Sequence, residues 1–596
     1  MKNYDFDAIV IGTGAAGYNA ACRLKEMGVN VAIVTEGVNC GTSRNTGSDK
    51  QTYYKLGLGG DSPDSVRKMA ENLFAGGCVD GDNALCEAAL SVRSFMNLCE
   101  LGVEFPVNRY GEYVGYKTDH DPYARATSAG PLTSKFMTEA LQKKAKEIGI
   151  ALCDNLLAVE ILKKGNAVCG LLCIEQKSGK AVAFKCGDIV MATGGPAGIY
   201  ADSVYPECHT GSSSLALLAG AKAQNLTMWQ YGLASVAPRW NVSGTYMQVL
   251  PRFVSIDSEG NEREFLTDYL VDAYTALNLV FLKGYQWPFD PKKAEKGSSQ
   301  IDMIVYNECV LKGRRVYLDF TKNPFGLDEI DYSKLSSEAY DYLNKAEATF
   351  GTPIERLAKM NAPAIELYNS KGVDITKDYL EIALCAQHNN GGIAVDMWWQ
   401  TAVRGLFAAG ECAGTHGISR PGGSALNAGQ VGSLRAAQYI SQHPNAPISN
   451  KEFNEIADSA MSALVNCAKS GDNIDELILA AQRRMSDNAA AVRDKAKIKV
   501  ALEQTAEDIA TLKSRAVVNK PERLYKYYKL RDILVTQGAV LTAMLNEDIS
   551  DTTKIQETYL AEGKFKCEMR PVRPLPQSDD FFENIWRTYR ENKNVF

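Results

Sequence analysis

One short stretch near the start of the chain constrains the fold more than any other. The apolar run Ala8–Ile11 leads into glycines in a GxGxxG spacing, Gly12, Gly14 and Gly17, and a helical pattern follows. A second apolar run ends in the acidic residue Glu36, about 20 residues beyond the glycines, where its carboxylate would accept a hydrogen bond from a ribose hydroxyl. Strand, glycines, helix, strand and acid in this order predict a βαβ unit that binds a dinucleotide.

Each glycine and the helix start have a physical role in such a unit. Gly12 permits the tight turn, Gly14 lets the backbone approach a pyrophosphate, and Gly17 allows the helix to pack closely on the strand. The helix begins near Ala15 and Ala16, and its free backbone N–H groups and positive dipole favour phosphate. This segment therefore predicts the site of the pyrophosphate.

Two later segments indicate which dinucleotide is bound. One buried strand, starting at Asp188, ends in the run Ala192, Thr193, Gly194 and Gly195. Another, starting at Gly405, ends in Gly410 and Glu411. Flavoproteins bring such strands back beside the first βαβ unit, and an acidic residue at a strand end then holds the ribityl chain. FAD is favoured over NAD.

The composition of the chain limits the class of protein and the partners that it can have. The chain has 596 residues, 45% of them hydrophobic and 23% charged, which is typical of a globular protein with several domains. Its formal charge of −6 predicts no nucleic-acid partner. No run of 18 or more apolar residues is present, and an early strand leaves no room for a signal peptide, so we expect no membrane insertion and a cytoplasmic location. The 15 cysteines and five histidines show no metal-ligand spacing, so no metal site is predicted.

Four further segments resemble, in the same order, the motifs of one enzyme family. Residues 208–221 resemble its TGDG…AGA helix, 316–320 its YLDL strand, 387–393 its HYTMGGI segment and 416–426 its HGANRLGSNSL segment. The chain is thereby identified as a member of the flavoprotein subunit family of fumarate reductase and succinate dehydrogenase. That family also holds L-aspartate oxidase, urocanate reductase and ketosteroid dehydrogenases. The resemblance covers residues 6 to about 440.

The resemblance implies an α/β fold. A Rossmann-like two-dinucleotide FAD-binding domain would carry an inserted α+β capping domain and be followed by a C-terminal helical domain. The implied boundaries are 1–225 and 375–445 for the two parts of the FAD-binding domain, 226–374 for the cap, 446–556 for the helical domain and 557–596 for an arm. Apolar residues at helical spacing support the helical domain, and three prolines after residue 570 favour an extended arm.

The resemblance also implies the chemistry. Substrate would lie against the flavin at the junction with the cap, and hydride would pass between flavin N5 and a carbon next to a carbonyl or carboxylate. Arg420 matches the family's substrate-binding arginine, and its guanidinium could hold such a group bidentately; a bracing role for the flavin-binding loop is the alternative. His388 lies one residue after the family's histidine position, which Gln387 occupies here, so a structural role is equally open.

The cap departs from the family pattern. Gly232 and Ala234 stand where QFHPTG has its carboxylate-binding histidine and threonine, and no arginine stands at the proton-donor position. Arg252 is the nearest candidate for that role, and Tyr231 is another because a phenol can protonate an enolate. Arg239 and Tyr246 are further alternatives.

Aromatic residues are dense in segments that the family places near its pocket. They are Trp229, Tyr231, Trp240, Tyr246, Trp398 and Trp399. Together with the lost polar groups they favour a flatter, less charged substrate than succinate. Plain core packing is the alternative.

The segment after the first βαβ unit indicates how FAD is held. The resemblance places Ser43, Arg44, Asn45, Thr46 and Gly47 at the flavin, together with Ser424 and Leu426 of the later motif. Arg44 and Asn45 stand where many relatives carry the histidine that bonds covalently to FAD, so non-covalent FAD is expected. Such flavins usually have a lower potential, which favours a reductase.

The predicted function is therefore that of an FAD-dependent reductase acting on a small molecule at a C=C or C–C bond next to a carbonyl or carboxylate. Electrons would come from a donor protein, reduced flavin or NADH. Two alternatives stay open: an amino-acid or amine oxidase like L-aspartate oxidase, and a flavin-bearing electron-transfer subunit. The basic stretch Ser514–Arg531 could dock a donor protein or be a solvated helix face.

Overall fold

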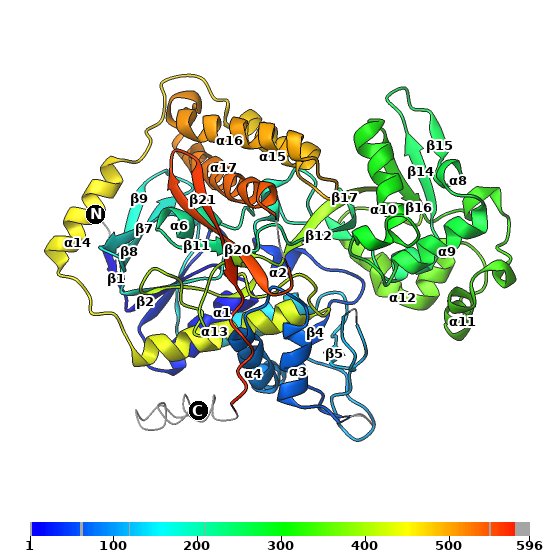
Figure 1. The fold of residues 1–596 in the computed structure, drawn as a ribbon, viewed down its shortest axis with the longest axis horizontal. Helices are drawn as coiled ribbons and strands as arrows, with labels where there is room; N and C mark the ends of the chain where they lie inside the picture. Colours follow the sequence, from blue (N-terminus) through cyan, green and yellow to red (C-terminus); the bar gives the residue numbers. More distant parts are fainter. Residues whose placement is uncertain (1–2, 60–62, 119, 208, 548–549, 579–596) are drawn as a thin grey trace.

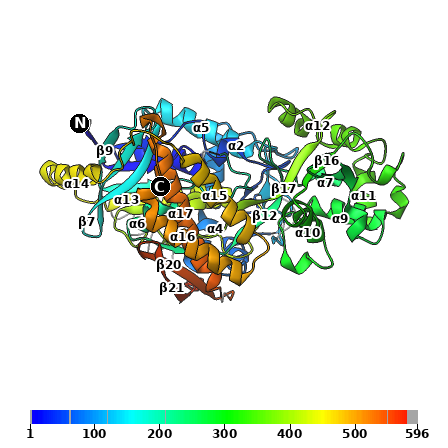
Figure 2. The ribbon, with the colours of Figure 1, turned by 90° about the horizontal axis from the view of Figure 1, so that it is seen from above.

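The structure, a computed structural model, describes residues 3–59, 63–118, 120–207, 209–547 and 550–578. Figures 1 and 2 show a large lobe and a smaller lobe beside it. The two long strands β12 (Trp229–Ser235) and β17 (Leu380–Asn389) run side by side between the lobes and pair antiparallel. The mixed α/β fold that the sequence predicts is confirmed.

A five-stranded parallel sheet forms the centre of the large lobe. Its order is β19 (Leu406–Ala408), β10 (Asp188–Met191), β2 (Ala8–Ile11), β3 (Val31–Val34) and β6 (Ala151–Cys153). The middle strands are entirely buried, which explains their unbroken apolar runs. Pairing of β2 with both β3 and β10 brings the first glycine turn beside the run that follows β10.

Helices and a second sheet cover this centre. Helices α1 (Ala15–Glu26) and α13 (Ser424–Gln442) pack against each other and contact the parallel sheet. The second sheet touches β10 through β8, and its order is β1 (Asn3–Asp5), β9 (Ala181–Lys185), β8 (Ala167–Glu175) and β7 (Leu156–Lys164). The lobe also contains α2 (Thr42–Asn45), β4 (Tyr53–Tyr54), α3 (Val66–Phe74), α4 (Gly81–Glu100), β5 (Ala126–Thr127), α5 (Thr133–Glu147) and α6 (Ser213–Leu218).

The smaller lobe is built on a six-stranded antiparallel sheet. Its order is β13 (Trp240–Asn241), β12, β17, β16 (Arg315–Asp319), β14 (Arg252–Ile256) and β15 (Glu262–Glu264). Around it lie α7 (Thr245–Gln248), α8 (Leu266–Tyr269), α9 (Ala273–Lys283), α10 (Ser299–Tyr306), α11 (Ser337–Lys345) and α12 (Pro353–Ser370). This lobe has a core of its own. Strand β17 belongs to this sheet although it falls in the segment predicted as the second part of the FAD-binding domain.

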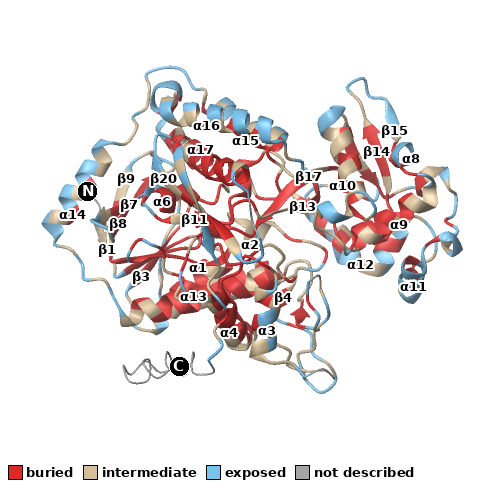
Figure 3. Cartoon of the chain, in the orientation of Figure 1, coloured by how far each residue is buried: buried red, intermediate tan, exposed pale blue. Residues whose placement is uncertain are grey.

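The C-terminal helices share the core of the large lobe. They are α14 (Asn450–Ser462), α15 (Ile474–Asn488), α16 (Lys495–Arg515) and α17 (Leu524–Leu545). Figure 3 shows α17 buried along most of its length, which agrees with the mostly apolar sequence of its second half. No described helix is both long enough and apolar enough to cross a membrane.

The end of the described chain is a β-hairpin. Strands β20 (Thr553–Ala561) and β21 (Lys564–Pro571) pair with each other, and β20 adds to β11 (Lys222–Gln224), which also pairs with β18 (Gly392–Ile393). The expected extended arm is thus replaced by ordered strands up to residue 571, because backbone pairing with β11 satisfies their hydrogen bonds. The part of that arm beyond residue 578 lies outside the described residues.

Candidate active site

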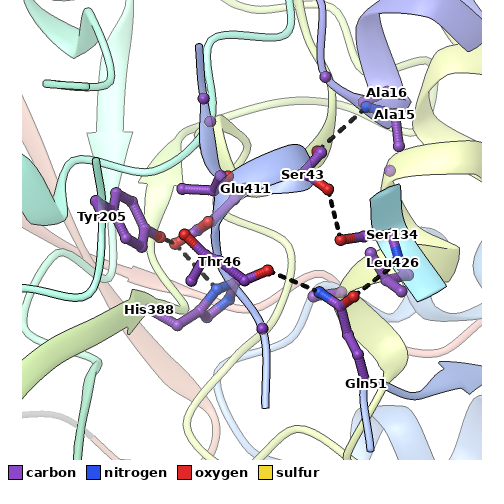
Figure 4. A pocket seen from close by; sticks show the side chains of 18 of the residues that line it. Ala15, Ala16, Ser43, Thr46, Gln51, Ser134, Tyr205, His388, Glu411 and Leu426 are labelled. Carbon is purple, nitrogen blue, oxygen red and sulfur yellow. Dashed lines mark hydrogen bonds and ion pairs between the residues drawn. The ribbon is translucent and has the colours of Figure 1, made fainter. Parts of the chain in front are cut away.

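A cavity of about 730 Å³ has walls from both lobes. At one end it is bounded by the β2–α1 turn, the end of β3 and the start of β7, and at the other by β12, β17 and the loop before α13. Figure 4 shows part of its polar wall. Among the described residues no cluster of three or more His, Cys, Asp or Glu could hold a metal ion.

The glycines at the dinucleotide end are required by close backbone contacts. Gly12 has φ +110°, and a Cβ there would lie 2.4 Å from the carbonyl oxygen of Ala192. A Cβ at Gly17 would lie 2.1 Å from the carbonyl oxygen of Gly12. Both distances are below any real contact, so only glycine fits at either place.

The start of helix α1 forms the adjoining wall. Gly14, Ala15 and Ala16 line the cavity, and the N–H of Ala15 donates to Ser43 Oγ at 3.2 Å (Figure 4). The first N–H groups of a helix have no partner within it and carry the positive end of its dipole. Helix α13 also begins at this cavity, with Leu426 in the wall. These features fit a group with a pyrophosphate.

Glu36 lies in the wall where a ribose would bind, and it forms an ion pair with Lys529 of α17. Nothing in the sequence pointed to this contact of Lys529, because α17 lies near the other end of the chain and only the tertiary fold brings the two residues together. Leu156 and Leu157, the first residues of β7, complete this end with apolar side chains. A polar ribose contact beside an apolar wall suits an adenosine.

The basic stretch that contains Lys529 is mostly paired within the protein. Arg523 pairs with Asp472 and Asp475, and Lys526 also pairs with Asp475. Arg531 donates to the carbonyl oxygen of a β7 residue. The residues that suggested a docking face therefore serve largely to attach α17 to its neighbours.

Most predicted cofactor residues lie on the cavity wall. The predicted residues that line it are Gly12, Gly14, Ala15, Ala16, Glu36, Ser43, Thr46, Gly47, Ala192, Thr193, Gly194, Gly410, Glu411 and Leu426. The predicted residues that do not line it are Gly17, Arg44, Asn45, Gly195 and Ser424.

The side chains outside the wall have partners elsewhere. Arg44 donates to Gln142 at 2.5 Å, and the Asn45 amide donates to the backbone carbonyl of Gly41 at 2.9 Å. Gly195 supports the wall from behind, since a Cβ there would lie 2.2 Å from Glu411 Oε1. Its role is to let that carboxylate approach the strand end.

Glu411 is the centre of a polar cluster at the flavin end. Its Oε1 accepts hydrogen bonds from the Tyr205 hydroxyl, from the backbone N–H of Asn389 at 3.2 Å, and from His388 Nδ1 at 2.9 Å (Figure 4). Burial alone would raise the pKa of Glu411, but His388 and these hydrogen bonds hold it below its ordinary value. The carboxylate is therefore ionised at neutral pH.

His388 reaches the cavity through a β-bulge. In the pairing of β12 with β17, Gln230 opposes His388 and Tyr231 opposes Ala386, so Gln387 is an extra residue with no partner. Neighbours on a regular strand point to opposite faces, whereas Gln387 and His388 both line the cavity. The bulge explains how a histidine displaced by one residue still reaches the pocket.

Both ring nitrogens of His388 are engaged. Nδ1 contacts Glu411, and Nε2 lies 3.3 Å from Nδ1 of His416. Burial lowers the pKa of His388 and, more strongly, that of His416. Both rings are therefore neutral at pH 7.

Arg420 provides the positive charge at this end. Its Nε donates to Asn390 Oδ1 at 3.1 Å and one Nη donates to Gln230 Oε1 at 2.8 Å, and the side chain lines the cavity. Arg420 forms no ion pair within 4.0 Å with a described carboxylate, although the negative charge of Glu411 favours its protonated form. Burial lowers the pKa of Arg420 to about 10, so it stays protonated at neutral pH.

The two predicted proton donors lie outside the cavity wall. Arg252 is held by three carboxylates of its own sheet, Glu262, Glu264 and Asp319, at 2.5 to 3.2 Å. The hydroxyl of Tyr231 faces the large lobe's core, 3.1 Å from that of Tyr200. The structure does not bring either residue to the site, because ion pairing and core packing fix their side chains elsewhere.

The further alternatives, Arg239 and Tyr246, also form hydrogen bonds with the backbone. Arg239 donates to the carbonyl oxygen of Tyr205, and the Tyr246 hydroxyl donates to that of Ala364.

The predicted aromatic wall is also differently composed. Trp240 packs behind Gly47, and Trp399 packs against Gly432, and neither lines the cavity. Trp229 and Trp398 are likewise outside the wall. Trp287 and Tyr285, which follow α9 and belong to no recognised motif, line it instead.

Comparison with known proteins decides the family. A family model described as an FAD binding domain matches residues 7–426. The chain belongs to this FAD-binding family. One subunit of the fumarate reductase (CoM/CoB) from Methanothermobacter marburgensis is 24% identical, covering 93% of this chain and 95% of its own. L-Aspartate oxidase 2 from Ralstonia nicotianae is 22% identical over 72% of this chain and 70% of its own.

A solved structure agrees on the fold. Sdh1 of Mycobacterium smegmatis, in complex with UQ1, superposes with a TM-score of 0.74 at 20% identity, covering 99% of this chain and 98% of the other. The predicted family and its FAD cofactor are confirmed: the protein is an FAD-dependent oxidoreductase related to fumarate reductase and succinate dehydrogenase flavoproteins and to L-aspartate oxidase. The glycine turns, the helix starts and Glu36 fit this group.

Proposed function

We propose that this FAD-dependent oxidoreductase reduces a C=C bond next to a carbonyl or carboxylate in a substrate other than fumarate. When bound, FAD supplies hydride chemistry at its N5. The observation that carries the proposal is Arg420, a protonated guanidinium in the cavity wall whose hydrogen-bond partners, Gln230 and Asn390, are both neutral.

Arg420 is positioned to hold one end of the substrate. Asn390 and Gln230 fix Nε and one Nη, and among the described residues no protein acceptor takes the other Nη. Glu411 favours the charged form of Arg420 without contacting it directly, and a charge in a protein interior is stabilised further when an anion pairs with it. A carboxylate or developing enolate would pair with Arg420, and its stabilisation would lower the barrier to reduction.

His388 is proposed as a positioning residue for Glu411. A neutral ring that donates from Nδ1 to Glu411 has only Nε2 left, and His416 occupies Nε2. His388 therefore has no free nitrogen to offer a substrate. It fixes the orientation of Glu411 in the wall.

A dicarboxylate fits this cavity poorly. Gly232 and Ala234 provide no side-chain donor, and the Trp287 indole and Gln387 amide that stand at Gly232 carry no charge, so the second carboxylate of fumarate would find no cationic partner at this position. Burial of a carboxylate without such a partner costs several kcal/mol. A substrate with a single carboxylate or carbonyl at the Arg420 end avoids this cost.

The test is reoxidation of the reduced holoenzyme with reduced viologen as the electron source. We expect turnover with a monocarboxylate enoate, such as an aryl or cyclic enoate, and fumarate turnover that is slower by at least about 100-fold. Fumarate turnover equal to that of the best monocarboxylate would refute the argument from Gly232 and Ala234. Reaction of reduced flavin with O₂ faster than with any enoate would instead support an oxidase.

Non-covalent attachment of FAD is part of this proposal. Arg44 and Asn45 occupy the expected linkage position, and both turn away from the cavity wall. Acid precipitation of the yellow protein should release all of its flavin as FAD. Flavin that stays with the pellet would show a covalent bond to another residue.

We further propose that electrons reach the flavin from a protein partner. The relative from Methanothermobacter marburgensis is by name one subunit of its enzyme. The alternative donors, NADH and free reduced flavin, would reduce the purified protein directly. Rapid bleaching of the flavin by NADH alone would decide against a protein donor.

A further inference from the structure

Three polar atoms on the cap side of the cavity have no protein partner. Trp287 Nε1, Gln387 Oε1 and Asn241 Oδ1 are buried, form no hydrogen bond with the described residues, and belong to residues that line the cavity. A buried polar atom without a partner costs about 1–3 kcal/mol, and native proteins leave few of them. Three such atoms on residues that line one cavity indicate that a ligand completes them.

The side chains of Trp287 and Gln387 both lie next to the backbone of Gly232. A Cβ on Gly232 would lie 3.0 Å from Gln387 Nε2 and 3.0 Å from Trp287 Nε1. The space that a side chain at position 232 would need is thus taken by the Trp287 indole and the Gln387 amide. These two side chains take the place of the family's carboxylate-binding histidine at this position.

Backbone contacts fix each of the three residues in place. The β-bulge of β17 puts Gln387 in the wall. The segment with Trp287 is tied to β12 by the N–H of Phe289, which donates to the Tyr231 carbonyl at 2.8 Å. Asn241 lies on β13, paired with β12. Gln387 and Asn241 are therefore presented by strands of the cap sheet, and Trp287 by a segment after α9 that is hydrogen-bonded to that sheet.

The chemistry of the three atoms defines what they can bind. An indole N–H can only donate, and the two amide oxygens can only accept. None of them is charged, and two acceptors repel a carboxylate. An uncharged group with an acceptor beside one or two N–H donors matches all three, and a carboxamide or a lactam has this arrangement.

We propose that the substrate carries an uncharged amide-type group at the end remote from Arg420, with its C=O accepting from Trp287 and its N–H donating to Gln387 and Asn241. This inference rests on the proposed function for the Arg420 end. Gln230, which holds Arg420, and Gly232 are two residues apart on β12, roughly 7 Å along a strand. A short planar enoate with a carboxylate and an amide at its two ends spans such a distance.

The experiment measures ligand binding to the oxidised holoenzyme by the perturbation of flavin absorbance. The probes are the monoamide of fumarate, fumarate, and crotonate, which share one carboxylate and the same C=C bond and differ at the other end. We expect the monoamide to bind at least about tenfold more tightly than either of the others. In Trp287→Phe, which keeps an aromatic side chain and loses the indole N–H donor, this preference should fall about tenfold.

Trp399→Phe is the matched control. Trp399 also has a buried Nε1 without a partner among the described residues, but it packs on Gly432 and does not line the cavity, so its replacement should leave the preference unchanged. Gln387→Leu removes the acceptor and provides a second test if Trp287→Phe fails to retain FAD.

Equal affinity for the three probes, or an unchanged preference in Trp287→Phe and Gln387→Leu, would overturn the inference. Its failure is distinct from failure of the proposed function. If the monoamide binds selectively but does not reoxidise the reduced flavin, the amide site stands and the reductase proposal is wrong. If enoates are reduced without regard to the amide, the reductase stands and the amide site is wrong.

Discussion

The two ends of the cavity are built in different ways. At the dinucleotide end the wall is made by backbone, because Gly12 and Gly17 allow chain segments to touch and helix α1 presents its first N–H groups. At the substrate end the wall is made by side chains such as Arg420, Gln387 and Trp287, which come from three separate segments. The first end is specified by neighbours in sequence. The second depends on how the lobes are assembled.

The comparison predicts its largest effect at Gly12. In Gly12→Val the Cβ would collide with the Ala192 carbonyl at a backbone conformation that valine disfavours, and FAD should be lost, with affinity down by about 100-fold or more. Measured flavin content of the purified variant checks this. Gly28→Ala is the control, since Gly28 also has positive φ but open space around it. A Gly12→Val protein that retains its FAD would show that the dinucleotide end does not depend on this backbone contact.

At the other end a side chain can be removed without disturbing the cofactor. Arg420→Ala should lower kcat/KM by roughly 100-fold or more, because the charge that pairs with the substrate is gone, while FAD content stays unchanged. Arg420→Lys should restore part of the rate but not the bidentate contact. Loss of FAD along with activity would instead assign Arg420 the role of bracing the flavin-binding loop.

A substitution of Arg252 tests whether this residue belongs to the substrate end of the cavity. Arg252→Gln leaves Asp319 buried without its cation, so the cap should lose about 3 kcal/mol of stability. Its kcat should stay within about twofold of the wild type, because the side chain does not line the cavity. Thermal unfolding and steady-state kinetics measure the two effects. A large fall in kcat with normal stability would show that Arg252 takes part in catalysis after all.

The smallest effect concerns the buried histidines of the substrate end. Burial lowers the folded-state pKa of His388 and His416 below the ordinary value of 6.5, so the unfolded chain binds protons that the folded one does not. Stability should therefore be highest above pH 6.5 and fall below it, by up to about 1.4 kcal/mol per pH unit for each group.

In His416→Asn the slope of the holoprotein's Tm between pH 7.5 and 5.5 should be shallower. His443→Asn, a change at an exposed residue at the end of α13, should keep the wild-type slope. Identical slopes in all three proteins would show that the rings are not protected from protonation.

The sequence was sufficient for the dinucleotide end because its requirements are local. A positive φ at Gly12 and a helix start at Ala15 leave a pattern that can be read over a few residues. Glu411 could also be placed, since it follows a recognisable strand. The family motif also predicted Arg420, which lies in the cavity wall.

The substrate end could not be read fully, because its geometry depends on tertiary contacts. The bulge that turns Gln387 into the cavity arises from strand pairing and has no glycine or proline signature. Trp287 follows a helix in the middle of the cap, where an isolated tryptophan is usually core. Arg252 and Tyr231 were expected in the site from their position in the chain, but their partners on adjacent strands and helices hold them elsewhere.

The ion pair between Glu36 and Lys529 has a consequence for biosynthesis. The dinucleotide fingerprint leaves the ribosome first, whereas β19 and α17, which complete the walls around it, are translated hundreds of residues later. A nascent chain therefore has to carry its first βαβ unit without a finished cofactor site during most of its synthesis. We therefore expect cofactor loading to follow completion of the chain, and protein truncated before α17 should be purified colourless.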